Sequence, residues 1–103
     1  MVDRFPRVGD NWRTRYHSLA LHNLTEMVQL PYLPFPDNFP DYLPKDRIAN
    51  WLEAYVDALE INYWTSTQFV GGTYDEQNQR WTARLERGGM PVELSPRHII
   101  TAT

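Results

Sequence analysis

The clearest hydrophobic pattern in the chain covers residues 46–60. Apolar side chains recur there at helical spacing and form a single stripe of Ile48, Trp51, Leu52, Tyr55, Val56 and Leu59. Asp46 stands at the start, where a carboxylate can accept hydrogen bonds from free backbone amides. Glu53, Asp57 and Glu60 fall off the stripe. The pattern predicts one amphipathic helix, with the stripe packed against a core and these three acidic residues in solvent.

After residue 62 the period of the pattern changes from 3.6 to about two. Residues 63–70 are rich in aromatic and β-branched side chains, and the glycine pair at 71–72 is typical of a bulge. Residues 80–86 alternate apolar and polar positions, and a second glycine pair at 88–89 precedes residues 90–94. These segments predict a three-stranded antiparallel meander with one face that needs cover.

The last residues show a third pattern, a short continuous apolar run. Ser95 and Pro96 end the meander, and residues 98–102 follow. A run of this kind is typical of a parallel strand that is buried on both faces. We therefore expect a final buried strand here.

Residues 30–43 combine many prolines with many aromatic side chains. Prolines 31, 34, 36, 40 and 44 remove amide donors and favour extended backbone. We expect an ordered loop anchored by Tyr32, Phe35, Phe39 and Tyr42. A Pro-rich linker or a polyproline peptide ligand are the alternatives.

The segment from Gly9 to Leu24 carries the residue types best suited to a ligand site. Residues 4–10 read as a loop, and residues 13–24 show no clean period but suggest a short extended piece. Trp12 and Arg13 can lie flat against a planar ring, and His22 can donate or accept a hydrogen bond. The plainer alternative is a surface turn with a half-buried Trp12 and an exposed Arg13.

Composition excludes several classes of function. The chain has 103 residues and a net charge of −3, which argues against a nucleic-acid partner. It has no cysteine, so a disulfide framework and a redox cysteine pair are excluded. Its histidines and carboxylates show no metal-ligand spacing, and no apolar run reaches the ~20 residues of a membrane span. We expect a cytoplasmic protein with no metal site.

Motifs along essentially the whole chain together resemble the class B flavin-containing monooxygenases, in particular a bacterial branch related to plant YUCCA-type enzymes. They are GDNWRxRYxSLxLH at 9–22, LPYLPFP at 30–36, FPxYxPK at 39–45, WLExY at 51–55, WTST at 64–67, YD at 74–75, Trp81 and IITAT at 99–103. The resemblance implies an α/β fold, α+β as a fragment, in which residues 1–103 are part of a Rossmann-like FAD-binding domain. The Gly-x-Gly-x-x-Gly unit would lie upstream and the NADP domain downstream.

The resemblance also implies an activity and a set of site residues. The parent protein would use FAD, NADPH and O2, and a flavin C4a-hydroperoxide would transfer one oxygen atom to a small organic substrate. His22 would border the reacting face of the flavin. Cofactor contacts would come from Asp3, Asn11, Trp12, Arg13, Asn23, Phe69 and Thr103. Asp3 would hold the adenosine ribose, at the end of a strand that includes Val2.

Two other classes of function stay open at this stage. The chain could be a free-standing helix-plus-meander interaction module that uses an exposed aromatic patch. The parent could also be another two-dinucleotide flavoprotein, such as a Baeyer–Villiger monooxygenase. Because a pyrophosphate site needs a glycine-rich turn at a helix N-terminus, we expect the 103 residues alone neither to bind FAD tightly nor to turn over. The remainder of the flavoprotein would be their partner.

Overall fold

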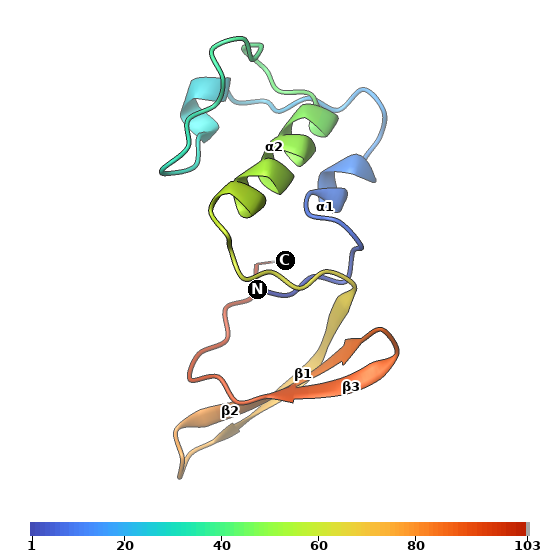
Figure 1. Cartoon of the computed structure of the whole chain (residues 1–103), viewed down its shortest axis with the longest axis vertical. Helices are drawn as coiled ribbons and strands as arrows, with labels where there is room; N and C mark the ends of the chain where they lie inside the picture. Colours follow the sequence, from blue (N-terminus) through green and yellow to red (C-terminus); the bar gives the residue numbers. More distant parts are fainter. Residues whose placement is uncertain (103) are drawn as a thin grey trace. The chain divides into compact units, whose positions relative to one another are not determined.

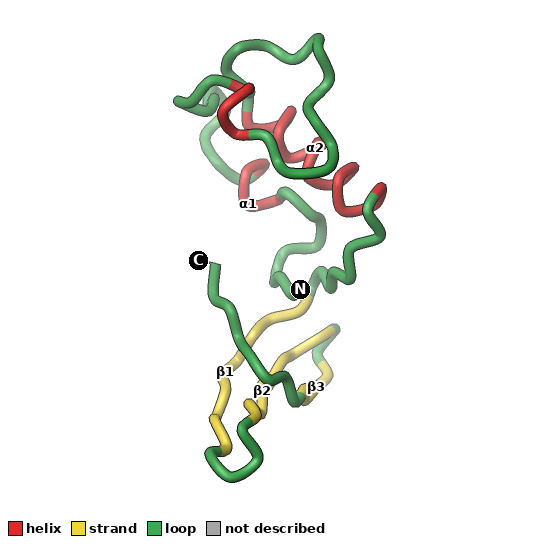
Figure 2. The backbone as a smooth tube through the Cα atoms, turned by 90° about the vertical axis from the view of Figure 1, so that its left-hand side faces the viewer, coloured by secondary structure: helices red, strands yellow, loops and turns green. Residues whose placement is uncertain are grey.

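The computed structural model describes residues 1–102, which form two compact units (Figures 1 and 2). Residues 5–62 make a helical unit. Residues 1–4 join the chain from residue 63 onward in a sheet unit. The two units together contain short helices and one antiparallel sheet, as predicted for an α+β fragment. The Rossmann-like origin of the fragment stays a prediction.

The helical unit contains α1 (Asp10–Arg13), the 3₁₀ helix η1 (Thr25–Val28) and α2 (Lys45–Ala58). Helix α2 confirms the predicted amphipathic helix with bounds shifted by one and two residues. The capping role of Asp46 is wrong: Pro44 occupies the cap position, and no side chain caps the helix. The Asp46 carboxylate instead accepts a hydrogen bond from the Lys45 ammonium at 2.8 Å.

The core of the helical unit is where the loop 30–43 meets α2. Phe35, Leu43 and Ile48 are buried there, and the ring centroids of Phe35 and Trp51 lie 5.5 Å apart. Phe39 stacks on Phe35 at 5.4 Å. This packing confirms two of the four predicted aromatic anchors and the apolar stripe of α2.

Tyr32 and Tyr42 do not anchor the loop, contrary to the prediction, because they are 87% and 53% exposed. The loop is held near Tyr32 by another residue: the Tyr55 hydroxyl donates to the Pro31 carbonyl oxygen at 2.8 Å. The absence of helix or strand in 30–43 agrees with the proline content.

A short extended piece precedes the loop, as the sequence suggested. Ala20 pairs with Pro44 in an antiparallel bridge. The Leu21 amide donates to the Leu43 carbonyl oxygen, and the Lys45 amide donates to that of Leu19, at 2.8 and 2.9 Å. The helices α1 and η1 on either side of this piece were not predicted, since four-residue helices show no readable period.

The sheet unit contains β1 (Thr67–Asp75), β2 (Arg80–Arg87) and β3 (Met90–Leu94), antiparallel in the order β1-β2-β3. The predicted meander is thus confirmed, although β1 starts four residues later than expected. The bulge interrupts the register between Phe69 and Gly71. Ala83 and Leu85, each 4% exposed, form the buried face.

The predicted final strand at 98–102 is wrong. These residues form no strand and are drawn as loop in Figure 2, and Ile100 is 91% exposed. A parallel strand needs neighbours on its edges to satisfy its backbone, and within residues 1–102 no strand pairs with this segment. At the other end, Val2 pairs with Trp64 in a single parallel bridge.

Candidate functional site

A pocket of about 350 Å³ opens in the helical unit. Its lining residues are Trp12, Leu21, His22, Asn23, Val28 and Ile48, and we call it the Trp12 pocket. Three of the predicted site residues, Trp12, His22 and Asn23, therefore meet at one cavity. They come from α1 and from the segment that follows the Ala20–Pro44 bridge.

The position of Trp12 depends on the turn that begins α1. Gly9 is the residue before the helix, with φ +85°, a left-handed conformation that glycine adopts without strain. The Gly9 carbonyl oxygen accepts hydrogen bonds from the amides of Trp12 and Arg13 at 2.9 and 3.2 Å. The Gly9 backbone lies close to α2, at Ala49.

The lining of the pocket is almost wholly apolar. Leu21, Val28 and the half-buried Trp12 pack against the core of Phe35, Leu43 and Ile48, which makes the floor apolar. His22 and Asn23 also line the pocket, and both residues are exposed. An apolar cavity of this kind suits the face and the apolar edge of a planar conjugated ring. Trp12 thus has a packing role as well as a place in the pocket.

Arg13 lies next to Trp12, but its guanidinium is engaged within the protein. One terminal nitrogen donates to the Val8 carbonyl oxygen at 2.7 Å and to Asp10 at 2.8 Å. The other donates to Asn50 and Glu53, both at 3.0 Å. The side chain is 17% exposed, so it joins α1 to α2 instead of projecting into solvent.

Glu53 holds a second arginine. The Arg7 guanidinium donates to both Glu53 oxygens, at 3.0 and 2.6 Å. This hydrogen bond, with the charge of Arg7, sets the pKa of the Glu53 carboxyl below its ordinary value. The prediction that Glu53 is merely solvated is therefore wrong, because two cations pair with it, Arg7 from the loop before α1 and Arg13 from α1.

Lys45 connects the start of α2 to the end of α1. It is 7% exposed, and its ammonium donates to the Arg13 carbonyl oxygen at 2.8 Å. Burial of an ammonium is costly unless it is paired and hydrogen-bonded, and Asp46 supplies the counter-charge. Arg7, Asp10, Arg13, Lys45 and Glu53 thus form a polar network that joins α1 and the residue Arg7 before it to α2.

The other predicted site residues lie elsewhere. Asn11 is exposed and does not line the Trp12 pocket. Asp3 belongs to the sheet unit, where its carboxylate accepts a hydrogen bond from the Tyr63 hydroxyl at 3.1 Å. Phe69 is 41% exposed on β1, and Thr103 is outside the described residues.

Sequence reasoning missed the pocket floor and the polar network. Leu21, Val28 and Ile48 read as ordinary apolar positions, which gave no sign of a cavity. A signal for the network was present on α2: the small Ala49 stands one turn before Glu53, a spacing that allows a second element to approach closely and pair with the carboxylate.

Residues 1–102 show neither a metal-binding group of side chains nor a membrane-spanning helix. No group of three histidine, aspartate or glutamate side chains there could hold a metal ion. No helix of this part of the chain has the length and hydropathy to cross a bilayer.

The chain is similar over its whole length to plant YUCCA proteins. It is 30% identical over 104 residues to the probable indole-3-pyruvate monooxygenase YUCCA9 of Arabidopsis thaliana and 31% identical over 104 residues to the indole-3-pyruvate monooxygenase YUCCA1 of Oryza sativa subsp. japonica. Each match covers 100% of this chain and 25% of the relative.

A further match supports the same assignment over part of the chain. The probable indole-3-pyruvate monooxygenase YUCCA10 of Arabidopsis thaliana is 35% identical over 76 residues, which cover 73% of this chain and 20% of the relative. The chain thus spans about a quarter of the length of the curated relatives it matches. No protein-family model matches it. These matches agree with the resemblance to YUCCA-type monooxygenases.

Proposed function

We propose that residues 1–103 form part of the FAD-binding domain of an FAD- and NADPH-dependent monooxygenase, which transfers one oxygen atom from O2 to a small organic substrate. The observation that carries this proposal is the Trp12 pocket, which gathers Trp12, His22 and Asn23 at one cavity. The similarity to YUCCA monooxygenases over the whole chain supports it.

The pocket fits part of the cofactor and not all of it. The isoalloxazine ring of a flavin is planar and has one apolar and one polar edge, and the apolar lining of the pocket suits the ring face and the apolar edge. The pyrophosphate of FAD needs a glycine-rich turn at a helix N-terminus, and the chain contains no such sequence. The pocket residues therefore fit the flavin ring, while the pyrophosphate-binding site would have to come from another segment.

Each pocket residue has a role that its chemistry allows. Trp12 would cover a face of the ring and, with Leu21, exclude water from it. His22 would hold or move a proton at the ring edge, and the Asn23 amide would hydrogen-bond there. When bound, the flavin would supply the redox and oxygen chemistry.

Arg13 takes a different role in this proposal from the one that its residue type suggests. Because its guanidinium donates to Val8, Asp10, Asn50 and Glu53, it would act through the position of Trp12. Any contact between Arg13 and the cofactor would come from the aliphatic part of its side chain and from the flat face of its guanidinium group.

The other parts of the proposal extend it to the parent protein. Asp3 would accept from the adenosine ribose, and Asn11, Phe69 and Thr103 would add further cofactor contacts. The remainder of a bacterial, cytoplasmic flavoprotein would supply the pyrophosphate site and the NADPH domain. Indole-3-pyruvate is the first substrate to assay, since the relatives are named indole-3-pyruvate monooxygenases.

The test is to express the chain together with the coding sequence that adjoins it. The purified protein should contain about one FAD per chain and oxidise NADPH with consumption of O2. Trp12→Ala should lower the flavin content, whereas Tyr16→Ala should not, since Tyr16 is 64% exposed and outside the pocket. A colourless protein that neither takes up FAD nor oxidises NADPH would refute the proposal.

A further inference from the structure

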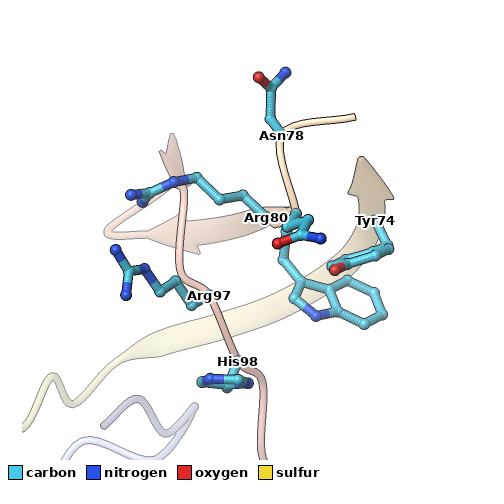
Figure 3. A pocket seen from close by; sticks show the side chains of 7 residues that line it. Tyr74, Asn78, Arg80, Arg97 and His98 are labelled. Atoms are coloured by element: carbon cyan, nitrogen blue, oxygen red, sulfur yellow. The ribbon is translucent and has the colours of Figure 1, made fainter. Parts of the chain in front are cut away.

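A second pocket, of about 750 Å³, lies in the sheet unit. It is lined by Tyr74, Asn78, Gln79, Arg80, Trp81, Arg97 and His98, most of which are labelled in Figure 3. We call it the Arg80 pocket. Nothing in the proposed flavin site involves these seven residues.

Two segments far apart in the sequence build this pocket, and hydrogen bonds fix them to each other. The Trp81 amide on β2 donates to the Pro96 carbonyl oxygen at 2.9 Å. The Arg80 guanidinium donates to the Ser95 carbonyl oxygen at 3.2 Å. The segment after β3 is thereby held against the start of β2, which brings Arg97 and His98 to the same cavity as Arg80.

The charge of the pocket is opposite to that of the chain. The chain carries a net charge of −3, whereas the lining contains two arginines and no carboxylate. In Figure 3 the guanidinium groups of Arg80 and Arg97 point to the same side. Among residues 1–102, no hydrogen bond or ion pair engages the Arg97 guanidinium, so all its donors are available to a ligand.

The nearest acidic residue in the register does not neutralise this charge. Asp75 is the β1 partner of Arg80. Its carboxylate accepts hydrogen bonds from the Gln77 and Asn78 amides and from the Asn78 side chain, at 2.9, 3.1 and 2.7 Å, and it forms no ion pair with Arg80. These donors, the Asn78 side chain first, lower the pKa of Asp75, so it serves the turn and stays charged there.

An aromatic wall stands beside the arginines. The rings of Tyr74 and Trp81 lie 5.3 Å apart at 54° and both line the pocket. Indole and phenol rings offer flat surfaces on which another planar ring can stack, and guanidinium groups bind phosphate and carboxylate with two parallel hydrogen bonds. The Asn78 and His98 side chains add further hydrogen-bonding groups.

We propose that the Arg80 pocket binds a small molecule in which a planar aromatic ring carries a phosphate or a carboxylate. The ring would stack on Trp81, and the anionic group would bind Arg97 and Arg80. This site goes beyond the proposed monooxygenase function, because it lies wholly within the sheet unit and needs no flavin.

The test is a titration of the chain, followed through the backbone and indole N–H signals of Trp81 by nuclear magnetic resonance. Four probes separate the contributions: adenosine 5′-monophosphate, indole-3-acetate, adenosine and inorganic phosphate. One of the two aromatic anions should bind at least about tenfold more tightly than adenosine or phosphate alone. The comparison of the two anions tells whether the pocket prefers phosphate or carboxylate.

Variants decide whether the arginines carry the binding. Arg97→Gln and Arg80→Gln should each weaken the preferred anion roughly fivefold to tenfold. Arg84→Gln is the matched control, since Arg84 is exposed on the same strand and outside the lining. The proposal is overturned if neither aromatic anion binds more tightly than adenosine and inorganic phosphate, or if Arg84→Gln weakens binding as much as Arg97→Gln.

Discussion

A Cβ atom built on Gly9 would lie 2.6 Å from the backbone oxygen of Ala49, so Gly9 is the point where α1 meets α2. Substitution of Gly9 by alanine must move backbone atoms, and it also places a side chain at φ +85°. We predict that Gly9→Ala destabilises the helical unit by more than about 2 kcal/mol. Hydrogen exchange of the α2 amides is the measurement.

Gly88 provides the control for that prediction. It also has a positive φ, +57°, but a Cβ there would meet nothing within 4 Å. Gly88→Ala should cost only the left-handed backbone penalty, about 1 kcal/mol, seen in the amides of β2 and β3. An equal loss of stability in the two variants would show that the left-handed conformation alone, and not the contact with Ala49, accounts for the effect of Gly9→Ala.

Arg13 supports a second prediction, because its guanidinium makes four hydrogen bonds, two of them to Asn50 and Glu53 on α2. Arg13→Gln should destabilise the helical unit by about 1–2 kcal/mol, a range that allows for the partial exposure of Glu53. Arg15→Gln is the control, since Arg15 is exposed and makes one hydrogen bond, to the Asn11 carbonyl oxygen at 3.2 Å. Urea unfolding of both variants checks the difference, and a loss in Arg15→Gln as large as that in Arg13→Gln would contradict it.

Glu53 makes the stability of the helical unit depend on pH. The Arg7 hydrogen bond lowers the pKa of Glu53 in the folded state. A lowered folded pKa gives a stabilising contribution that is complete above the unfolded value, roughly 4.3, and is lost as pH falls through the folded value. Glu53→Gln should therefore flatten the acid side of the stability profile. An unchanged acid slope in Glu53→Gln, measured by urea unfolding between neutral and acidic pH, would rule this out.

The residues of this network show where sequence reasoning reaches its limit. The helix at residues 45–58 and the meander were predictable because their patterns repeat every 3.6 or two positions. Arg7, Arg13 and Glu53 are brought together only by tertiary packing, and Arg7 and Glu53 are 46 positions apart. No local pattern encodes such a pairing, and Glu53 was therefore read as a solvated residue.

The run at 98–102 shows the opposite error. Its composition is that of a buried strand, but composition alone cannot supply the neighbouring strands that bury it, and Ile100 is 91% exposed. The Trp12 pocket lies between these two cases. Its aromatic and polar members could be named from the sequence, whereas the apolar floor required the packing of Ile48 and Val28 to be known.

The aromatic core of the helical unit gives a further stability prediction. Phe35 is 7% exposed and packs against Phe39 and Trp51. Phe35→Ala should cost about 3–5 kcal/mol, since it removes a buried ring and leaves a cavity. Tyr42→Ala, in the same loop but at a site that is 53% exposed, should change stability by less than about 1 kcal/mol. Thermal unfolding of the two variants distinguishes a packed loop from a linker, in which both substitutions would be harmless.

The Trp12 pocket leads to a prediction about the 103-residue chain by itself. Because the pocket suits the flavin ring and the chain lacks a glycine-rich pyrophosphate site, riboflavin and FAD should bind weakly and with similar affinity, within about threefold. A titration followed by quenching of flavin fluorescence measures both. Trp12→Ala should abolish the quenching, and Trp64→Phe is the control, as Trp64 lies in the sheet unit. Tight, stoichiometric FAD binding would mean that the chain binds the pyrophosphate through residues outside any glycine-rich turn. The proposal that this chain holds only the flavin ring would then be wrong.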